Sequence, residues 1–238
     1  MSNKKKWNIA INIIIILLGL VLIKNENLIL SQIAISLISG SIGSFITIFL
    51  SPENRKTKDN VLSKWKMTKI YKLRTEKNME SDQLLIKTKN YIDGVAFGLR
   101  TWRENNSDEI LKALNRGVNI RLITMNPLSH HTKERANEEG KNENIEQSIN
   151  DLITFAKEMN SKSEKGRIYL KGYDCMTLDF YWRMDNCIFV GPYLYKFSSG
   201  STITYKFESG GKGFEYYKKY FEKLWNDNSL IDLLKGNN

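Results

Sequence analysis

Two long apolar stretches open the chain, and an alternating polar and apolar pattern follows them. Residues 7–23 and 28–50 contain no charged residue, and the polar segment 24–27 separates them. As a helix rising about 1.5 Å per residue, the second stretch reaches roughly 34 Å, enough for a hydrocarbon core of about 30 Å. The first lies at the short end of the spanning range. We predict a transmembrane helical hairpin in residues 1–50.

The charges beside these stretches predict their orientation. Three lysines, residues 4–6, precede the first stretch, and five cations follow the second: Arg55, Lys56, Lys58, Lys64 and Lys66. Cytoplasmic flanks carry the excess of Lys and Arg, so both termini are expected in the cytoplasm. No small-residue cleavage site follows the first stretch, which argues against a signal peptide. The expected location is the cell inner membrane, with more than one span.

Residues 51–66 are polar, basic and begin next to Pro52, which indicates a juxtamembrane linker. Each cation held near anionic lipid would contribute about 1 kcal/mol to membrane binding. A linker that is simply solvated fits the same composition. Both interpretations remain open from the sequence.

From Met67 onward the hydrophobic pattern alternates between strand and helix periods. Helix signals are Ser-Asp pairs before an apolar run, and strand signals are short β-branched or aromatic runs. A long charged loop is expected at 126–142. The pattern predicts helices at 81–92, 107–117, 142–159 and 213–225, and strands at 67–73, 94–99, 118–125, 167–173, 178–184, 187–197 and 201–207. This order predicts an α/β domain over 67–238, a mixed sheet with helices on its faces.

Charge and rare residues narrow the chemistry. The formal net charge of +10 favours anionic partners, although a basic membrane-facing surface would explain it equally. Two cysteines, Cys175 and Cys187, form no disulfide framework, and the two histidines are adjacent at 130 and 131. The sequence therefore predicts no metal site, no cofactor and a reducing compartment.

Small residues recur along the second apolar stretch. Ser36, Gly40 and Ser44 are spaced by four, and Gly43 lies on an adjacent row. Such spacing lets transmembrane helices approach closely. The partner helix is either the first span of the same chain or a second copy, and the sequence leaves this choice open. Neither stretch holds an ionisable residue, which argues against a transporter.

Two segments, "ALNRGVNIRLIT" at 113–124 and "FYWRMDNCIFVG" at 180–191, resemble one half of a phospholipase D-like domain. The resemblance implies that Asp185 occupies the family's aspartate position. The family's histidine nucleophile then falls on Leu178, and its lysine falls on Phe180. Leucine cannot attack phosphorus, and phenylalanine offers no charge to a developing phosphorane. The resemblance therefore implies the fold without the activity, and we expect no catalytic residue.

A pocket without the catalytic residues could still bind a ligand. Alternate side chains of a strand share a face, so Phe180 and Trp182 are expected to point together and could stack a nucleobase. Arg121 and Arg183 are candidate phosphate partners, and Asp185 completes the predicted ligand site. In the competing interpretation, the two aromatic residues pack in the core and Arg183 lies in solvent. The turn at 198–202 either cradles phosphate or is an ordinary polar hairpin turn.

The architecture, two short spans on a soluble domain with a degenerate pocket, resembles the membrane effectors of bacterial anti-phage systems. The resemblance implies a non-enzymatic sensor-effector whose domain binds a cyclic nucleotide and controls helix assembly that disrupts the membrane. The expected partners are membrane lipid, a cyclic nucleotide and further copies of the chain, and not a nucleic acid duplex. The alternatives are a membrane-tethered phosphodiesterase or phospholipase with an unorthodox site, and a scaffold for a protein partner.

Overall fold

The computed structural model describes residues 3–24, 27–50, 61–139, 145–176 and 178–235. The chain divides into two compact units, Met1–Asn60 and Val61–Asn238. Of the predicted linker 51–66, residues 51–60 lie outside the described part, including Arg55, Lys56 and Lys58. Residues 61–65 are helical and belong to the second unit, where Trp65 packs its ring 6.4 Å from Phe207.

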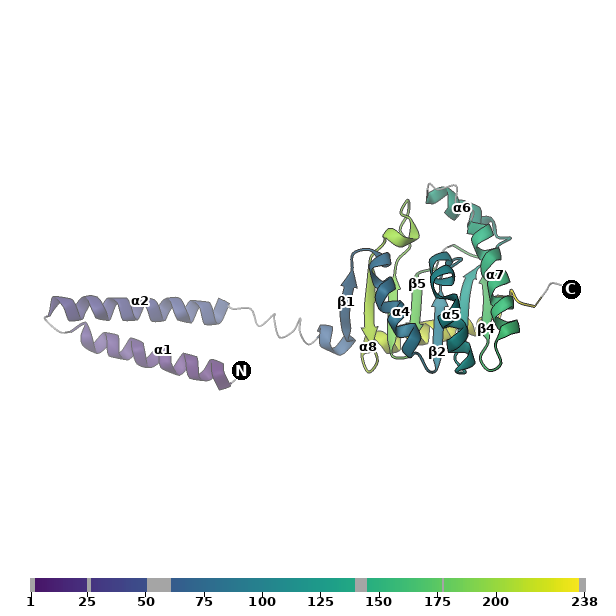
Figure 1. The fold of residues 1–238 in the computed structure, drawn as a ribbon. Helices are drawn as coiled ribbons and strands as arrows, with labels where there is room; N and C mark the ends of the chain where they lie inside the picture. Colours follow the sequence, from purple (N-terminus) through teal and green to yellow (C-terminus); the bar gives the residue numbers. More distant parts are fainter. Residues whose placement is uncertain (1–2, 25–26, 51–60, 140–144, 177, 236–238) are drawn as a thin grey trace. The chain divides into compact units, whose positions relative to one another are not determined.

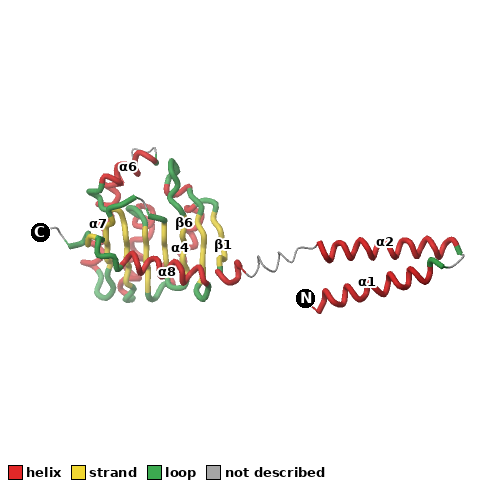
Figure 2. Tube along the Cα trace, turned by 180° about the vertical axis from the view of Figure 1, so that it is seen from behind, coloured by secondary structure: helices red, strands yellow, loops and turns green. Residues whose placement is uncertain are grey.

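The first unit contains helices α1 (Asn3–Leu22) and α2 (Leu28–Leu50), which lie side by side (Figures 1 and 2). Ala34 and Ser41 of α2 are buried, and a side chain at Gly19 of α1 would begin 2.7 Å from Ile38. Within the described residues, one segment, Ile29–Thr47, is long and apolar enough to cross a membrane, whereas the apolar part of α1, Trp7–Leu22, is shorter. One candidate span is therefore present.

The second unit is built on an eight-stranded mixed sheet in the order β1-β7-β6-β5-β2-β3-β4-β8. Strands β2, β3 and β4 are parallel, and the other neighbouring pairs are antiparallel. The strands are β1 (Met67–Tyr71), β2 (Tyr91–Val95), β3 (Asn119–Met125), β4 (Ile168–Tyr173), β5 (Phe180–Met184), β6 (Cys187–Gly191), β7 (Thr204–Glu208) and β8 (Ile231–Asp232). The predicted α/β class with a mixed sheet is confirmed.

Helices cover both faces of the sheet, as Figures 1 and 2 show from opposite sides. Helices α4 (Asn78–Lys87), α5 (Arg100–Asn115) and α7 (Ile145–Lys162) lie on one face, and α8 (Lys212–Trp225) crosses the other. Each face has its own apolar core, one containing Leu85, Ile110 and Leu152, the other Phe214 and Phe221 of α8. The helical segments are η1 (Arg74–Lys77), α4 (Asn78–Lys87), α5 (Arg100–Asn115), α6 (His130–Glu138), α7 (Ile145–Lys162), η2 (Ser199–Ser201) and α8 (Lys212–Trp225).

The structure corrects three predicted boundaries. The helix expected at 81–92 begins at Asn78 and ends at Lys87, because Thr88 leaves it with an extended backbone and β2 begins at Tyr91. The helix expected at 107–117 starts earlier, at Arg100. The loop expected at 126–142 contains α6, whose first turn is capped by the Ser129 hydroxyl accepting from the His131 amide at 3.2 Å.

Candidate functional site

The predicted ligand residues do not share one site, because β5 places its side chains alternately on the two faces of the sheet. Phe180 and Trp182 point toward the α4–α5 face, and both are almost fully buried there. Arg183 points toward the α8 face, where its guanidinium lies over the Phe214 ring. Leu178 packs with the α8-side core, since it precedes β5 and escapes the strand's alternation.

Arg121 and Arg183 belong to a neutralised network on the α8 face. The fully buried Asp93 carboxylate accepts from Arg121 Nε at 2.7 Å and from Arg183 Nη1 at 3.1 Å. Glu222 of α8 accepts both terminal nitrogens of Arg121, at 2.7 and 3.1 Å. Although burial lowers the pKa of Arg121, these hydrogen bonds raise it above its usual value. Two cations meet two carboxylates, so the network links α8 to the sheet.

Asp185 organises the turn between β5 and β6. Its backbone adopts a left-handed conformation with φ of 42°. Its carboxylate accepts the backbone amides of Lys89, Asn90 and Tyr91 at 2.8 to 3.0 Å. These three bonds fix the start of β2, so the described geometry gives Asp185 a structural task at the turn.

A cavity of about 390 Å³ lies on the opposite face, where β2 ends and α5 begins. This volume lies within the range typical of small-molecule sites. Phe180 and Trp182 line it, whereas Arg121, Arg183 and Asp185 are not among its lining residues. Residues of η1, α4, the 96–102 segment and η2 complete the wall.

Two cations in this wall come from η1, a segment that the sequence analysis did not single out. Lys77 is 7% exposed, and among the described residues its Nζ has one hydrogen-bond acceptor, the Asn78 amide oxygen at 3.5 Å. Burial, and then the neighbouring Arg74, lower the pKa of Lys77 to about 8. Arg74 is equally buried, donates to the Pro192 carbonyl at 2.9 Å, and lies over the Phe180 ring. Among the described residues neither cation forms an ion pair.

The N-terminus of α5 forms another part of the wall. Residues 99–102 all line the cavity, no side chain caps the helix, and its first turn holds no acidic residue. The first N–H groups of a helix lack intrahelical partners and carry a partial positive charge, so they attract anions. Leu99 enters the helix with φ of 51°, a left-handed conformation that is strained for leucine.

Aromatic rings complete the cavity. Trp102 of α5 meets Trp182 edge to face at a centroid distance of 5.1 Å. A side chain at Gly94 would begin 2.6 Å from the Trp182 ring, so glycine permits this ring to lie against β2. Both indole N–H groups and the Arg74 Nε are buried without a hydrogen-bond partner in the described structure.

The cavity also contains two carboxylates, and each has a partner of its own. Asp82 accepts from the Asn106 amide at 3.0 Å. Glu139 pairs with Arg135 at 2.9 Å and accepts from the Ser199 hydroxyl at 3.0 Å. The wall also holds three cations, Arg74, Lys77 and Arg100, and none of them forms an ion pair with a described residue. The wall also includes Ser199 and Gly200, from the turn considered above as a phosphate cradle.

No protein-family model and no curated protein matches the chain. Among solved structures, it is similar to TrmBL2, an archaeal chromatin protein described with a novel mode of DNA binding. The identity is 15%, the TM-score is 0.43, and the match covers 81% of this chain and 67% of that one. It is also similar to NucT from Helicobacter pylori, with 11% identity and a TM-score of 0.43, over 69% of this chain and 97% of that one. At these TM-scores neither likeness carries an argument about function.

One predicted partner statement needs correction. The sequence analysis expects no nucleic acid duplex among the partners, yet a protein with a similar arrangement is a DNA-binding chromatin protein. The prediction was wrong to exclude a duplex, because a chain with a formal net charge of +10 favours anionic partners and gives no physical ground for doing so.

Proposed function

We propose that the chain is a membrane-anchored, non-enzymatic sensor whose soluble domain binds a nucleotide-type anion in the cavity between η1 and α5. The observation that carries the proposal is Lys77, a buried ammonium that forms no ion pair with a described residue and lines the same cavity as a helix N-terminus. Its pKa, lowered from 10.5 to about 8, corresponds to a cost of about 3 kcal/mol for holding the charge. An anionic ligand would offset that cost, and the aromatic wall suits a base.

The family's histidine nucleophile has no counterpart among the described residues of the wall, which supports binding over catalysis. Within the described lining residues there is no histidine or cysteine. We propose that the domain is a phospholipase D-like half in which Leu178 and Phe180 replace the family's catalytic pair. Lys77 Nζ lies 5.3 Å from the Phe180 ring centroid, so a cation from another segment approaches that position. Such a cation would hold phosphate without attacking it.

The membrane part of the proposal rests on the outward face of α2. Ser36, Gly40, Gly43 and Ser44 are exposed, and side chains built at the two glycines would meet no atom within 4 Å. At about 100° per residue, Ser36 and Gly43 lie opposite the face that packs on α1, whereas Gly40 and Ser44 lie toward its side. This supports packing of a second copy on α2. We propose a two-span hairpin in the inner membrane with both termini cytoplasmic, whose assembly, governed by the ligand, disrupts the membrane in anti-phage defence.

Calorimetric titration of the full chain in detergent tests the ligand. The probes are cyclic AMP, cyclic di-AMP and a short DNA duplex. We expect one of the two cyclic nucleotides to bind without being hydrolysed, and the duplex to bind more weakly. Failure of both nucleotides to bind, or tighter binding of the duplex, would overturn the nucleotide assignment. Turnover of a nucleotide would instead establish the phosphodiesterase alternative.

Membrane depolarisation in cells, followed with a potential-sensitive dye, tests the output. Gly40→Leu should abolish the damage, because a bulky side chain separates the helix backbones without reducing hydrophobicity. Ile42→Leu, an isomeric change at another exposed position of α2, is the matched control and should retain the damage. If Gly40→Leu damages the membrane as strongly as the parent chain, the helices serve only as an anchor. Reporter fusions at both ends check the topology.

A further inference from the structure

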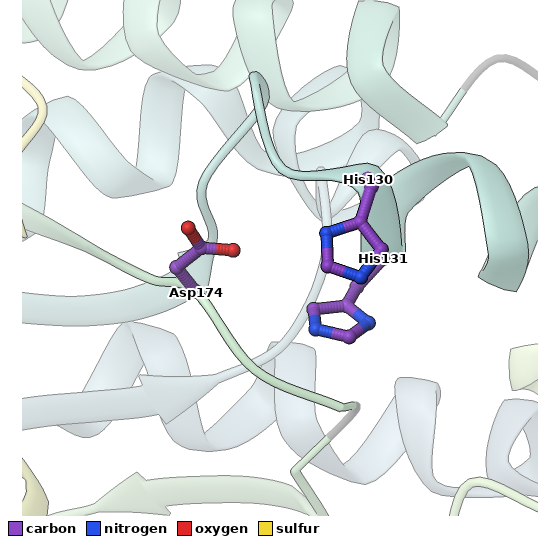
Figure 3. A group of neighbouring side chains, drawn as sticks. All are labelled: His130, His131 and Asp174. Atoms are coloured by element: carbon purple, nitrogen blue, oxygen red, sulfur yellow. The ribbon is translucent and has the colours of Figure 1, made fainter.

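A second cluster of functional side chains lies outside the cavity, where two parallel strands end. Strand β3 ends at Met125, and α6 begins with His130 and His131. Strand β4, paired with β3, ends at Tyr173, and Asp174 follows directly. The Asn126 amide donates to the Tyr173 carbonyl at 2.7 Å, which holds the two strand ends together. Figure 3 shows the two imidazole rings and the Asp174 carboxylate gathered on this edge.

We propose that His130, His131 and Asp174 bind a first-row transition-metal ion of the zinc type. One ligand atom from each residue lies within 4.8 Å of the others. Tetrahedral zinc with bonds of about 2.0 to 2.2 Å requires ligand atoms roughly 3.3 to 3.6 Å apart, so side-chain rotations close the site. His130 and Asp174 are exposed, which leaves the ion a path of entry.

Neighbouring groups already orient two of the ligands. Glu134, one turn along α6, lies 2.8 Å from Nδ1 of His131, so that nitrogen carries the proton and Nε2 keeps its lone pair. The Ser129 hydroxyl donates to Oδ1 of Asp174 at 2.5 Å, which leaves Oδ2 for the metal. A carboxylate behind a ligating histidine and a hydrogen bond behind a ligating carboxylate are the usual supports of metal sites.

The ligand types select the ion. Two imidazole nitrogens and one carboxylate oxygen suit Zn²⁺ and its transition-metal neighbours, whereas Mg²⁺ and Ca²⁺ prefer oxygen ligands alone. Three protein ligands leave a fourth position for water. The sequence analysis predicted no metal site because the chain has only two histidines, which are adjacent, and no metal-spaced cysteine pair. The ordered helix α6 and the pairing of β3 with β4 bring the histidine pair and Asp174 together.

Competition with a chromogenic chelator measures the affinity for Zn²⁺. The full chain carries only these two histidines, so a tag without histidine removes the main background. We expect one Zn²⁺ per chain with micromolar or tighter affinity, and no competition by millimolar Mg²⁺. His130→Ala, His131→Ala and Asp174→Asn should each weaken binding at least about tenfold. Glu134→Gln should weaken it about 10-fold to 100-fold through His131.

Cys175→Ser is the matched control, because this exposed thiol is adjacent to Asp174 but lies outside the proposed ligand set. It should bind Zn²⁺ as the parent does. Zn²⁺ should also raise the thermal midpoint of the parent chain and leave that of His131→Ala unchanged. Equal affinity of the parent and both histidine variants, affinity weaker than about 100 µM in the parent, or loss of Zn²⁺ in Cys175→Ser would overturn the site.

Discussion

The cations on the two faces of the sheet differ in whether carboxylates pair with them. On the α8 face, Arg121 and Arg183 surround Asp93, and Glu222 adds a second carboxylate. On the α4–α5 face, Lys77 and Arg74 lie in a cavity wall without an ion pair among the described residues. Burying a charge is costly unless it is paired. The first cluster therefore stabilises the fold, and the second is what a site for an anion requires.

The substitution with the largest expected effect on this comparison is at Asp93, the carboxylate between the two arginines. Asp93→Asn preserves the shape of the side chain but leaves the buried Arg183 and the half-buried Arg121 with Glu222, which is 39% exposed, as their counter-charge. We expect the free energy of unfolding to fall by about 3 to 5 kcal/mol. Urea unfolding of the full chain in detergent, followed by tryptophan fluorescence, measures this loss. Asp151→Asn is the control: its carboxylate is exposed and 3.9 Å from Arg103, so it should cost less than about 1 kcal/mol. Equal losses would remove the distinction.

Lys77→Met should change stability and binding in opposite directions. Removing the unpaired ammonium should raise the free energy of unfolding by about 1 to 3 kcal/mol, because its desolvation cost disappears. The same change should weaken nucleotide binding by about 1.5 to 3 kcal/mol, the value of a hydrogen bond to a charged group. Unfolding and calorimetric titration measure the two effects. Lys112→Met, at an exposed lysine paired with Glu109, should leave binding unchanged. A Lys77→Met chain that is less stable, or that binds normally, would contradict the assignment.

The pH dependence of nucleotide binding tests whether the charge of Lys77 contributes to the affinity. The free domain holds Lys77 with a pKa of about 8, because burial and Arg74 disfavour its charge, against 10.5 when exposed. An anionic ligand binds the protonated form, so affinity should be constant below about pH 7.5 and fall above pH 8. The fall approaches tenfold per pH unit until the pKa of the complex is reached. Titrations between pH 6.5 and 9.5 measure it, and the slope should vanish in Lys77→Met.

Without ligand, the lysine has the reverse effect on stability. Its folded pKa lies below its unfolded pKa, so the unfolded chain binds more protons between about pH 8 and 10.5. Stability should therefore gain from this group as pH rises through that window. A gain that persists in Lys77→Met would assign the effect to another group.

Glu222→Gln is the mildest test of the paired cluster. Hydrogen bonds from Arg121 lower the pKa of Glu222, so its contribution is present above the unfolded carboxyl pKa and is lost as pH falls below it. The side chain is 39% exposed, so solvent screening limits the expected loss to less than about 1 kcal/mol at pH 7. Unfolding at pH 7 and pH 4 should show a smaller difference in the variant than in the parent. A loss as large as that of Asp93→Asn would mean that α8 depends on this contact alone.

Hydrophobic periodicity accounts for what sequence reasoning predicted well. Strand and helix periods over 67–225 predicted the mixed sheet and its helices, and Phe214 and Phe221 of α8 do pack on the sheet as helical spacing requires. The alternation of Phe180, Trp182 and Arg183 in β5 was also predictable, because successive side chains of a strand point to opposite faces. These features depend on residues close together in the chain.

The residues of the candidate site were predicted less well than the strands and helices. Arginine looked like a phosphate partner at 121 and 183, but Asp93 and Glu222 neutralise both residues from other elements. Lys77 was overlooked because it follows a strand in a short polar segment, where an exposed side chain is the ordinary expectation. The sequence does show two cations, Arg74 and Lys77, in the segment that follows β1. They indicate a candidate anion site only once the structure shows that both are buried.

The sequence by itself determined the apolar segment that could cross a membrane, the main strands and helices of the α/β domain in their order, and the side of β5 on which each residue lies. These depend on local composition and on fixed periods of the backbone. Only the tertiary structure decided which charges are paired, which helix N-terminus lines a cavity, and that Asp174 lies beside the histidine pair. Such properties arise from contacts between residues far apart in the chain, since desolvation and Coulomb interactions depend on distance in space.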